Sequence, residues 1–368
     1  MSTLAASLRT HPARVVVAAF VVLGVVLPFL LPQYWLATAV FILIAAIGAL
    51  GLAVLTGRTG QISLGHAFFL GIGAYVGGYL GGDLHLTAAL WIPAAGLAAG
   101  ILGGLVGPTA LRLRGLYLAI VTIGLLYIGQ HVFVNWPALT GGPGGRALAD
   151  PTFGPLQFQN GADVFGLGLT RDGLYYYLAL LLLALAMLYV RNLDRSKVGR
   201  GMAAVRDREV AAAVLGVNVA RTKVTSFIVS SALAGVSGAL FGAYLGFVVP
   251  TSWSLVLSVE YVVMIVVGGM TSLWGPLLGA LFVIGLPSLL QDPDIAGSLP
   301  FITSPTNPSQ GFISASDAAA VVYGVLLVVF LLLEPRGVAG LVQRAAAATT
   351  RRRATTQSIP VPARGGTE

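Results

Sequence analysis

Long apolar runs separated by short polar segments make up most of this chain. Ten runs can be interpreted as membrane spans, because about 20 consecutive apolar residues are needed to cross a bilayer as a helix. These runs cover roughly residues 15–31, 35–55, 61–81, 86–110, 115–135, 173–190, 223–249, 258–270, 274–290 and 315–333. The pattern predicts an all-α polytopic membrane protein with about ten transmembrane helices.

Two of the runs depart from an ordinary span. Run 61–81 begins with a polar, glycine-rich stretch that includes Gln61 and His66. Run 258–270 has only about 13 residues, which is too short to cross a bilayer without help. The pattern therefore fits either ten crossings or eight crossings plus a re-entrant pair formed by 258–270 and 274–290.

The positions of the basic residues test this pattern independently. If the N-terminus is cytoplasmic and the spans alternate, all of the 21 Lys and Arg residues except Arg146 and Arg171 fall on the inner side. Membrane proteins carry this bias toward basic residues inside the cell. It predicts an even number of crossings, with both termini in the cytoplasm.

The composition supports a membrane protein and excludes several other classes. Charged residues make up only 9% of the chain, whereas soluble domains are about 25% charged. The chain has no cysteine, which excludes disulfides and thiolate metal sites. Its net charge of +8 comes from the predicted inner segments, so we do not expect nucleic-acid binding.

The sequence lacks an energy source of its own. Lys197 and Lys223 are the only lysines, and no GxxxxGK[ST] phosphate-binding loop is present, so ATP would have to be bound by another polypeptide. No acidic or basic residue falls at the middle of a predicted span, which disfavours coupling to protons. These observations favour a transporter that is powered by a separate ATP-binding polypeptide. The alternative class is a gradient-driven carrier that works alone. No catalytic set of residues converges within the spans, so we expect no enzymatic activity.

Three segments lie outside the predicted spans. Segment 136–172 is rich in Gly and Pro and is predicted to fold over the extracytoplasmic surface of a permease domain that covers residues 1–341. Segment 191–222 is charged and cytoplasmic. The tail at 342–368 lacks apolar periodicity and is predicted to be disordered, solvated or in contact with anionic lipid.

Segment 191–222 contains a predicted amphipathic helix from Gly201 to Leu215, which Gly216 and Asn218 would end. A short amphipathic helix between two spans can lie flat and fit a groove of a partner protein. The alternative is an interfacial helix that only anchors the loop to lipid headgroups.

Polar side chains inside the apolar runs are candidates for lining a translocation path. In hydrocarbon such groups need partners, so they either face water or form hydrogen bonds between helices. The candidates are Gln61, Ser63, His66, Thr122 and Gln130. Thr140 to Gly145 could form part of an outer gate or a contact for an extracytoplasmic binding protein, and Glu260 or Asp317 could meet a substrate ammonium. No second ligand lies at a useful spacing from His66, so no metal site is predicted.

Seven motifs that occur in order along the chain carry a family resemblance. They are GRTGQISLGHAFFLGIGAY (57–75), LRLRGLYLAIVTIG (111–124), NWPALTGGPGG (135–145), LYYYLAL (174–180), SKVGRGMAAVRDREVAAAVLGVNVARTKVTSFIVSSALAGVSGALFG (196–242), VGGMTSLWGPLLGALFVIGLP (267–287) and EPRGVAGL (334–341). With these motifs the chain resembles the LivM-type permease subunits of binding-protein-dependent ABC importers for branched-chain amino acids, over most of residues 35–341.

The resemblance implies a heteromeric importer. A LivH-like second permease would pair with this chain, two ATP-binding subunits would lie beneath, and an extracytoplasmic binding protein would deliver the substrate. The chain itself would hold no cofactor, because ATP would be bound by the partner subunits. The segment from Gly199 to Gly216 would meet the ATPase, with Gly199, Arg200, Arg206, Glu209 and Gly216 as the coupling residues.

The chain departs from the family pattern at one place. The family often carries a glutamate and then a basic residue after LYLAIVT, whereas Tyr127 and Gln130 stand at the corresponding positions here. Related permeases carry urea or short amides, so these substrates are the alternative to branched-chain amino acids.

Overall fold

The computed structural model describes residue 24, residues 26–292 apart from 114, 155, 159–161 and 165–166, and scattered residues between 302 and 328. Of the predicted elements, the tail 342–368 lies outside the described residues. The runs 15–31 and 315–333 lie largely outside them.

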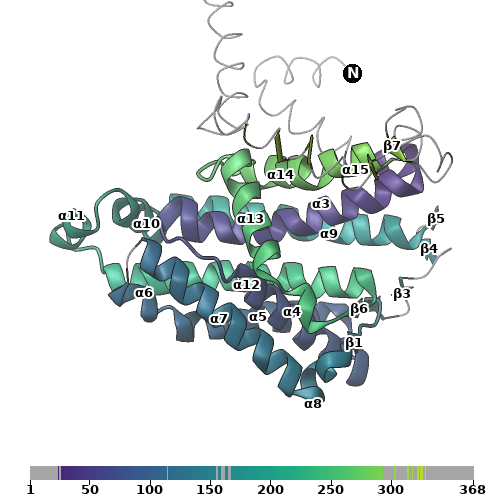
Figure 1. Ribbon diagram of the computed structural model, residues 1–368, viewed down its shortest axis with the longest axis horizontal. Coiled ribbons are helices and arrows are strands. Elements are labelled where there is room, and N and C mark those ends of the chain that lie inside the picture. Colours follow the sequence, from purple (N-terminus) through teal and green to yellow (C-terminus); the bar gives the residue numbers. More distant parts are fainter. Residues whose placement is uncertain are drawn as a thin grey trace, which may run out of the picture.

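Helices dominate the described part of the chain (Figure 1). The α-helices are α3 (Gln33–Leu52), α4 (His66–Gly78), α5 (Ala88–Val106), α6 (Thr109–Arg112), α7 (Leu116–Asn135), α8 (Pro137–Thr140), α9 (Arg171–Arg195), α10 (Lys197–Asp207), α11 (Glu209–Val214), α12 (Val219–Leu245), α13 (Leu255–Gly268), α14 (Gly275–Ala280) and α15 (Leu286–Gln291). Wider π-helical turns continue three of them, namely η1 (Ala53–Arg58) after α3, η2 (Tyr79–Asp83) after α4 and η5 (Leu281–Gly285) between α14 and α15.

Short strands and 3-10 turns lie mainly in the connections. The antiparallel pairs are β1 (Arg146–Ala147) with β6 (Phe247–Val248), β2 (Thr152–Phe153) with β3 (Leu156–Gln157), and β4 (Ala162–Val164) with β5 (Leu167–Leu169). The parallel pair is β7 (Ile302–Thr303) with β8 (Ile313–Ser314). The 3-10 turns are η3 (Gly142–Gly144) and η4 (Pro250–Ser252). We call the two ends of the bundle the α10 end and the β1 end, on the left and right of Figure 1.

Six helices in the described part are long and apolar enough to cross a membrane. They are Gln33–Arg58, Ala88–Val106, Leu116–Asn135, Arg171–Arg195, Val219–Leu245 and Pro250–Gly268. The prediction of a polytopic all-α membrane protein is thus confirmed, whereas the count of ten and the cytoplasmic termini stay predictions. The run predicted at 258–270 is shorter than the observed segment. Turn η4 and helix α13 together form an apolar segment of 19 residues, Pro250–Gly268.

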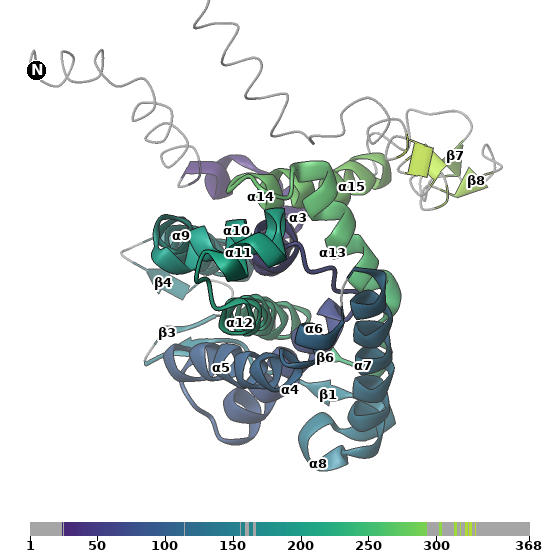
Figure 2. The same ribbon diagram turned by 90° about the vertical axis from the view of Figure 1, so that its left-hand side faces the viewer.

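Helix α12 occupies the centre of the bundle. It packs against α5 and α4 on one side and against α3 on the other, and Figure 2 shows it end-on between these layers. The contact with α4 is close because both helices present glycines, with Gly73 against the Gly235 carbonyl and Gly238 against the Leu70 carbonyl. Small residues allow helix backbones to approach in this way.

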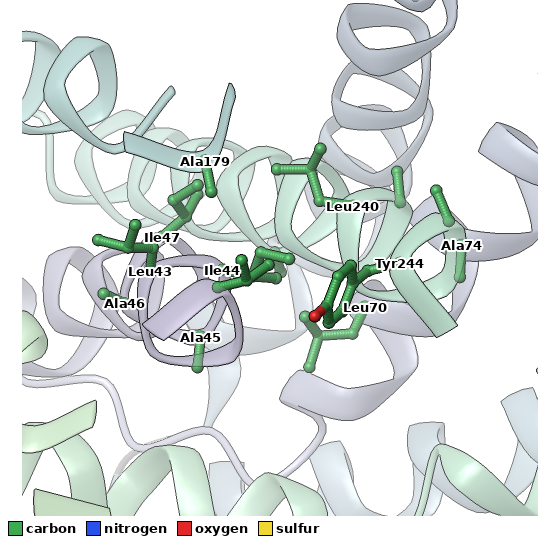
Figure 3. Close-up of a cluster of buried hydrophobic side chains, with 14 of the residues drawn as sticks. Leu43, Ile44, Ala45, Ala46, Ile47, Leu70, Ala74, Ala179, Leu240 and Tyr244 are labelled. Carbon is green, nitrogen blue, oxygen red and sulfur yellow. The ribbon is translucent and has the colours of Figure 1, made fainter. Parts of the chain in front are cut away.

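The apolar core joins α3, α4, α9 and α12. Figure 3 shows Ile44 and Ile47 of α3 with Leu70 of α4 and Leu240 of α12, and Ala179 of α9 lies beside them. These side chains are almost completely buried. Helix α3 is therefore apolar on nearly all sides, as expected for a helix enclosed by other helices.

Two predicted helices differ from the observed ones. The run predicted at 61–81 becomes helical only at His66, and residues 61–65 are not helical. The helix predicted from Gly201 to Leu215 is broken at Arg208, whose extended backbone (φ −155°, ψ 102°) separates α10 from α11.

Candidate translocation and coupling sites

The non-helical segment at 61–65 leads back from the α10 end into the bundle. His66, the first residue of α4, places Nε2 3.0 Å from the carbonyl oxygen of Gly48 in α3. Because a carbonyl only accepts, Nε2 carries the proton in this contact. Arg58 is ten residues beyond Gly48 on the same continuous helix, a distance of about 15 Å. Helix α4 therefore begins well inside the bundle.

Side chains of other helices satisfy the backbone of this segment. The Leu64 N–H donates to Thr122 Oγ1 of α7 at 2.9 Å, and the Ala67 N–H donates to Ser258 Oγ of α13 at 3.0 Å. Non-helical backbone at membrane depth persists only where protein or water satisfies it. These two hydroxyls therefore fix the segment between α7 and α13.

Gln61 and Ser63 are buried in the same segment. Gln61 Nε2 donates to Thr59 Oγ1 at 2.9 Å and to Ser226 Oγ of α12 at 2.8 Å. Gln61 Oε1 and Ser63 Oγ have no hydrogen-bond partner among the described residues. An unsatisfied buried polar atom is costly, so these two oxygens mark a place where water or a solute group would be stabilised.

The five predicted path residues fall into two places. Gln61, Ser63, His66 and Thr122 lie in or against the segment 61–67, where all four are buried within the chain. Gln130 lies apart from them on α7, where its Nε2 donates to the Trp253 carbonyl at 2.8 Å. Their role in lining the path stays a prediction.

Sequence reasoning missed a row of buried serines on α12, one of which, Ser226, bonds to Gln61. Ser226, Ser230 and Ser237 are all buried on α12, and Ser237 Oγ donates to the Ile44 carbonyl at 2.7 Å. Their spacing of four and seven residues places them along one face of a helix. Serines that recur on one face of an otherwise apolar run therefore predict buried hydrogen-bonding groups, and this pattern could have identified them from the sequence.

The segment that joins α9 to α12 contains the predicted coupling residues. The Gly199 N–H donates to Ser196 Oγ at 3.2 Å, which caps α10. Gly216 ends α11 with a positive φ of 83°, and Asn218 caps α12 by accepting from the Arg221 N–H at 2.9 Å. The prediction that Gly216 and Asn218 end the helical segment is confirmed, with Gly216 suited to the left-handed backbone.

The charged coupling candidates mostly face their own chain. Arg206 Nη1 donates to the Gly57 carbonyl at 3.1 Å, and Glu209 pairs with the buried Lys223 of α12 at 2.9 Å. Arg200 is exposed and donates to the Arg195 carbonyl at 2.8 Å. The coupling role of these residues stays a prediction.

The exposed surface of this segment includes a group of apolar side chains at and next to α11. Val210 and Val214 of α11 and Leu215, which follows it, are exposed by 69%, 83% and 81%. Figure 1 shows α11 at the extreme of the α10 end. Exposed apolar side chains grouped at one tip indicate an interaction site.

An ion pair ties the turn at η1 to α9. Arg58 Nε and Nη2 donate to the two carboxylate oxygens of Asp194 at 2.8 and 3.1 Å. Arg58 Nη1 also donates to the Ala53 carbonyl at 3.3 Å. The Arg58 side chain is 8% exposed and that of Asp194 is 39% exposed, so only the arginine is buried.

This asymmetry predicts that Asp194→Ala lowers the melting temperature more than Arg58→Met. Without Asp194, the buried guanidinium of Arg58 keeps only the Ala53 carbonyl as a partner. This lowers the free energy of unfolding by up to about 3–5 kcal/mol. Losing Arg58 leaves a carboxylate that water already reaches. Thermal unfolding of the detergent-solubilised variants measures the order, and the double variant Arg58→Met/Asp194→Leu should recover part of the loss. Equal losses, or the reverse order, would contradict this account.

The candidate outer gate lies at the β1 end. Thr140 Oγ1 donates to the Phe133 and Trp136 carbonyls at 2.5 and 2.8 Å. Strand β1 follows directly and pairs with β6, which links the segment to the connection between α12 and α13. The gate role of Thr140 to Gly145 stays a prediction. Asp317 accepts a hydrogen bond from Ser314 Oγ at 2.7 Å.

The chain is similar in sequence to known membrane transport proteins. The family described as "Branched-chain amino acid transport system / permease component" matches residues 34–331. The chain is 36% identical over 296 residues to the high-affinity branched-chain amino acid transport system permease protein LivM of Escherichia coli (strain K12), which covers 77% of the chain and 70% of LivM. No solved structure matches the chain.

More distant relatives cover between 69% and 80% of the chain. The high-affinity branched-chain amino acid transport system permease protein LivH of Escherichia coli (strain K12) is 25% identical to the chain over 315 residues. The match covers 80% of the chain and 91% of LivH. The autoinducer 2 import system permease protein LsrC of Enterobacter sp. (strain 638) is 28% identical over 261 residues, or 69% of each protein.

Proposed function

Since the chain belongs to the family of permease components of branched-chain amino acid transport systems, we propose that it is the LivM-type membrane subunit of an ABC importer for these amino acids. The observation that carries the substrate class is the 36% identity to LivM over 296 residues. The chain would form a gateway in the bacterial inner membrane, without covalent chemistry, through alternating access to either side.

The partners in this proposal follow from what the chain lacks. A LivH-like permease would complete the gateway, two ATP-binding subunits would power it, and an extracytoplasmic binding protein would deliver the substrate. In this arrangement the α10 end is cytoplasmic, both termini lie in the cytoplasm, and about ten helices cross the membrane. The exposed tip of α11 supports the docking of an ATPase at this end.

Transport in proteoliposomes tests the proposal. The chain reconstituted with a LivH-like permease, the two ATPases and a leucine-loaded binding protein should take up leucine when ATP is supplied. Uptake should fall to background with a non-hydrolysable ATP analogue, because the chain has no energy source of its own. The same vesicles assayed with urea and acetamide test the alternative substrates.

A control preparation with the chain alone separates the two classes of transporter. Vesicles that contain only this chain should not concentrate leucine under a proton or sodium gradient. Concentration by the lone chain would establish a gradient-driven carrier and overturn the proposed importer.

A further inference from the structure

Glu260 lies in the middle of a candidate membrane span. The span that η4 and α13 form runs from Pro250 to Gly268, so Glu260 is ten residues from one end and eight from the other. With a helical rise of about 1.5 Å per residue, the end at Gly268 is about 12 Å away. In the run predicted at 258–270 Glu260 is the third residue, and the longer observed span moves it from near an end to the centre.

This position distinguishes Glu260 from the other charged side chains of the six candidate spans in the described part of the chain. The remaining Asp, Glu, Lys and Arg residues of these spans all lie within four residues of a span end. Glu260 is half-buried and has no hydrogen bond or ion pair among the described residues. A carboxylate at the centre of a bilayer is costly without a partner, so it marks a functional site.

The neighbours of Glu260 on α13 contact the start of α4. Ser258 Oγ accepts a hydrogen bond from the Ala67 N–H at 3.0 Å. The centroid of the Tyr261 ring lies 5.1 Å from that of the His66 ring. Glu260 is within two residues of both contacts, and therefore lies at the depth in the bundle where α4 begins.

Hydrogen-bond acceptors without donors lie close to this depth. Gln61 Oε1 and Ser63 Oγ, five and three residues before His66, are buried and have no partner among the described residues. A carboxylate and an amide oxygen only accept hydrogen bonds, and a serine hydroxyl can accept them as well. This part of the chain therefore lacks donors, and only a donor with a positive charge would also neutralise Glu260.

We propose that Glu260 binds the ammonium group of the solute as it crosses the membrane, and thereby restricts transport to solutes that carry such a group. The inference rests on the proposed function, because branched-chain amino acids carry an ammonium whereas urea and short amides do not. An ammonium donates three hydrogen bonds, so it suits Glu260 and then the free oxygens of Ser63 and Gln61. A hydrogen bond between two charged groups is stronger than one between neutral groups. The carboxylate therefore separates the two classes of substrate.

Exchange of the carboxylate for an amide tests this role. Glu260→Gln keeps the size of the side chain and removes its charge. In proteoliposomes with the LivH-like permease, the two ATPases and a leucine-loaded binding protein, leucine uptake should fall by about tenfold or more. Glu260→Asp should keep part of the uptake. The melting temperature and copurification with the ATPases should stay as in the unmodified chain.

Val256→Gln is the matched control. It places the same amide at an exposed position one helical turn earlier on α13. Leucine uptake with this variant should equal that of the unmodified chain, because no carboxylate is lost. Equal losses from Val256→Gln and Glu260→Gln would show that the added amide, and not the missing charge, impairs transport, which would overturn the inference.

Thiol chemistry separates the charge of Glu260 from its packing, because the chain has no native cysteine. Glu260→Cys should be inactive, and reaction with the anionic reagent sulfonatoethyl methanethiosulfonate should restore part of the uptake. The neutral reagent methyl methanethiosulfonate should restore none. The complex with the unmodified chain, treated in the same way, reveals any reaction at cysteines of the partner subunits.

The contrary outcomes are distinct. Unchanged uptake with Glu260→Gln, a thiol at position 260 that no reagent reaches, or recovery with the neutral reagent would each overturn the inference and leave the proposed function intact. A lower melting temperature or lost copurification with Glu260→Gln would show that the carboxylate pairs with a basic group of a protein instead. If the complex with the unmodified chain takes up no leucine with ATP, the proposed function itself fails and the role of Glu260 fails with it.

Discussion

Replacement of Gly238 by alanine is expected to prevent the chain from accumulating as a folded membrane protein. A Cβ at this position of α12 would overlap the Leu70 carbonyl of α4. A backbone carbonyl cannot move aside as a flexible side chain can, so α4 and α12 would have to separate. Overpacking of a tight core costs about 1–3 kcal/mol and occasionally more, and we place this contact at the upper end. Gly73→Ala should act similarly, since its Cβ would overlap the Gly235 carbonyl.

The yield of monodisperse protein in detergent and its melting temperature measure this effect. Gly285→Ala is the matched control, because its Cβ would meet only Leu281 at 3.5 Å and Ile42 at 3.7 Å, both ordinary contacts. Alanine also favours helix over glycine by up to about 1 kcal/mol. The control should therefore melt at the original temperature or slightly above. A Gly238→Ala protein as stable as this control would show that α4 and α12 are not packed as described.

The long helices could be predicted from the sequence because each is a local pattern. Runs 35–55, 115–135 and 223–249 match α3 with η1, α7 and α12 to within a few residues. The length of an apolar run is enough to predict these helices, because a helix needs about 20 apolar residues to cross the hydrocarbon core of a bilayer. The same reasoning found the polar group that includes Gln61, Ser63 and His66.

The start of α4 could not be predicted by such reasoning. Residues 61–65 look helical when only neighbours are considered, yet Leu64 and Gln61 form hydrogen bonds with Thr122 and Ser226 on two other helices. Those partners are 58 and 165 residues away in the chain. A local pattern contains no information on such partners. This explains why the helix was expected several residues too early.

The break at Arg208 was missed for a related reason. Neither glycine nor proline marks that position, and the local residues favour a continuous helix. Glu209 begins α11 and reaches Lys223 of α12 instead. The ion pair between Glu209 and Lys223 joins residues 14 positions apart in the chain, and Glu209 starts the second, short helix α11.

Val214→Asp is expected to leave the chain folded but to abolish its assembly with the ATPase and ATP-driven uptake. Val214 is 83% exposed at the tip of α11, so a carboxylate there stays hydrated in the free chain. In a docked complex the same carboxylate would be buried among apolar groups without a partner. Loss of an interface hot spot reduces the binding free energy by about 2 kcal/mol or more. The affinity then falls by roughly 30-fold or more. Val214→Leu keeps the apolar contact and should assemble normally.

Copurification of the ATPase with tagged chain, together with melting temperature and uptake in proteoliposomes, distinguishes the possible roles of α11. Charge reversal at Arg206 or Glu209 is a less specific probe, because those side chains bond to Gly57 and Lys223 of their own chain. Such variants would disturb the fold and the docking together. Normal assembly and uptake with Val214→Asp would mean that the ATPase docks elsewhere. A lower melting temperature in the isolated chain would mean instead that α11 packs on its own subunit, and the exposed tip would then have no role in coupling.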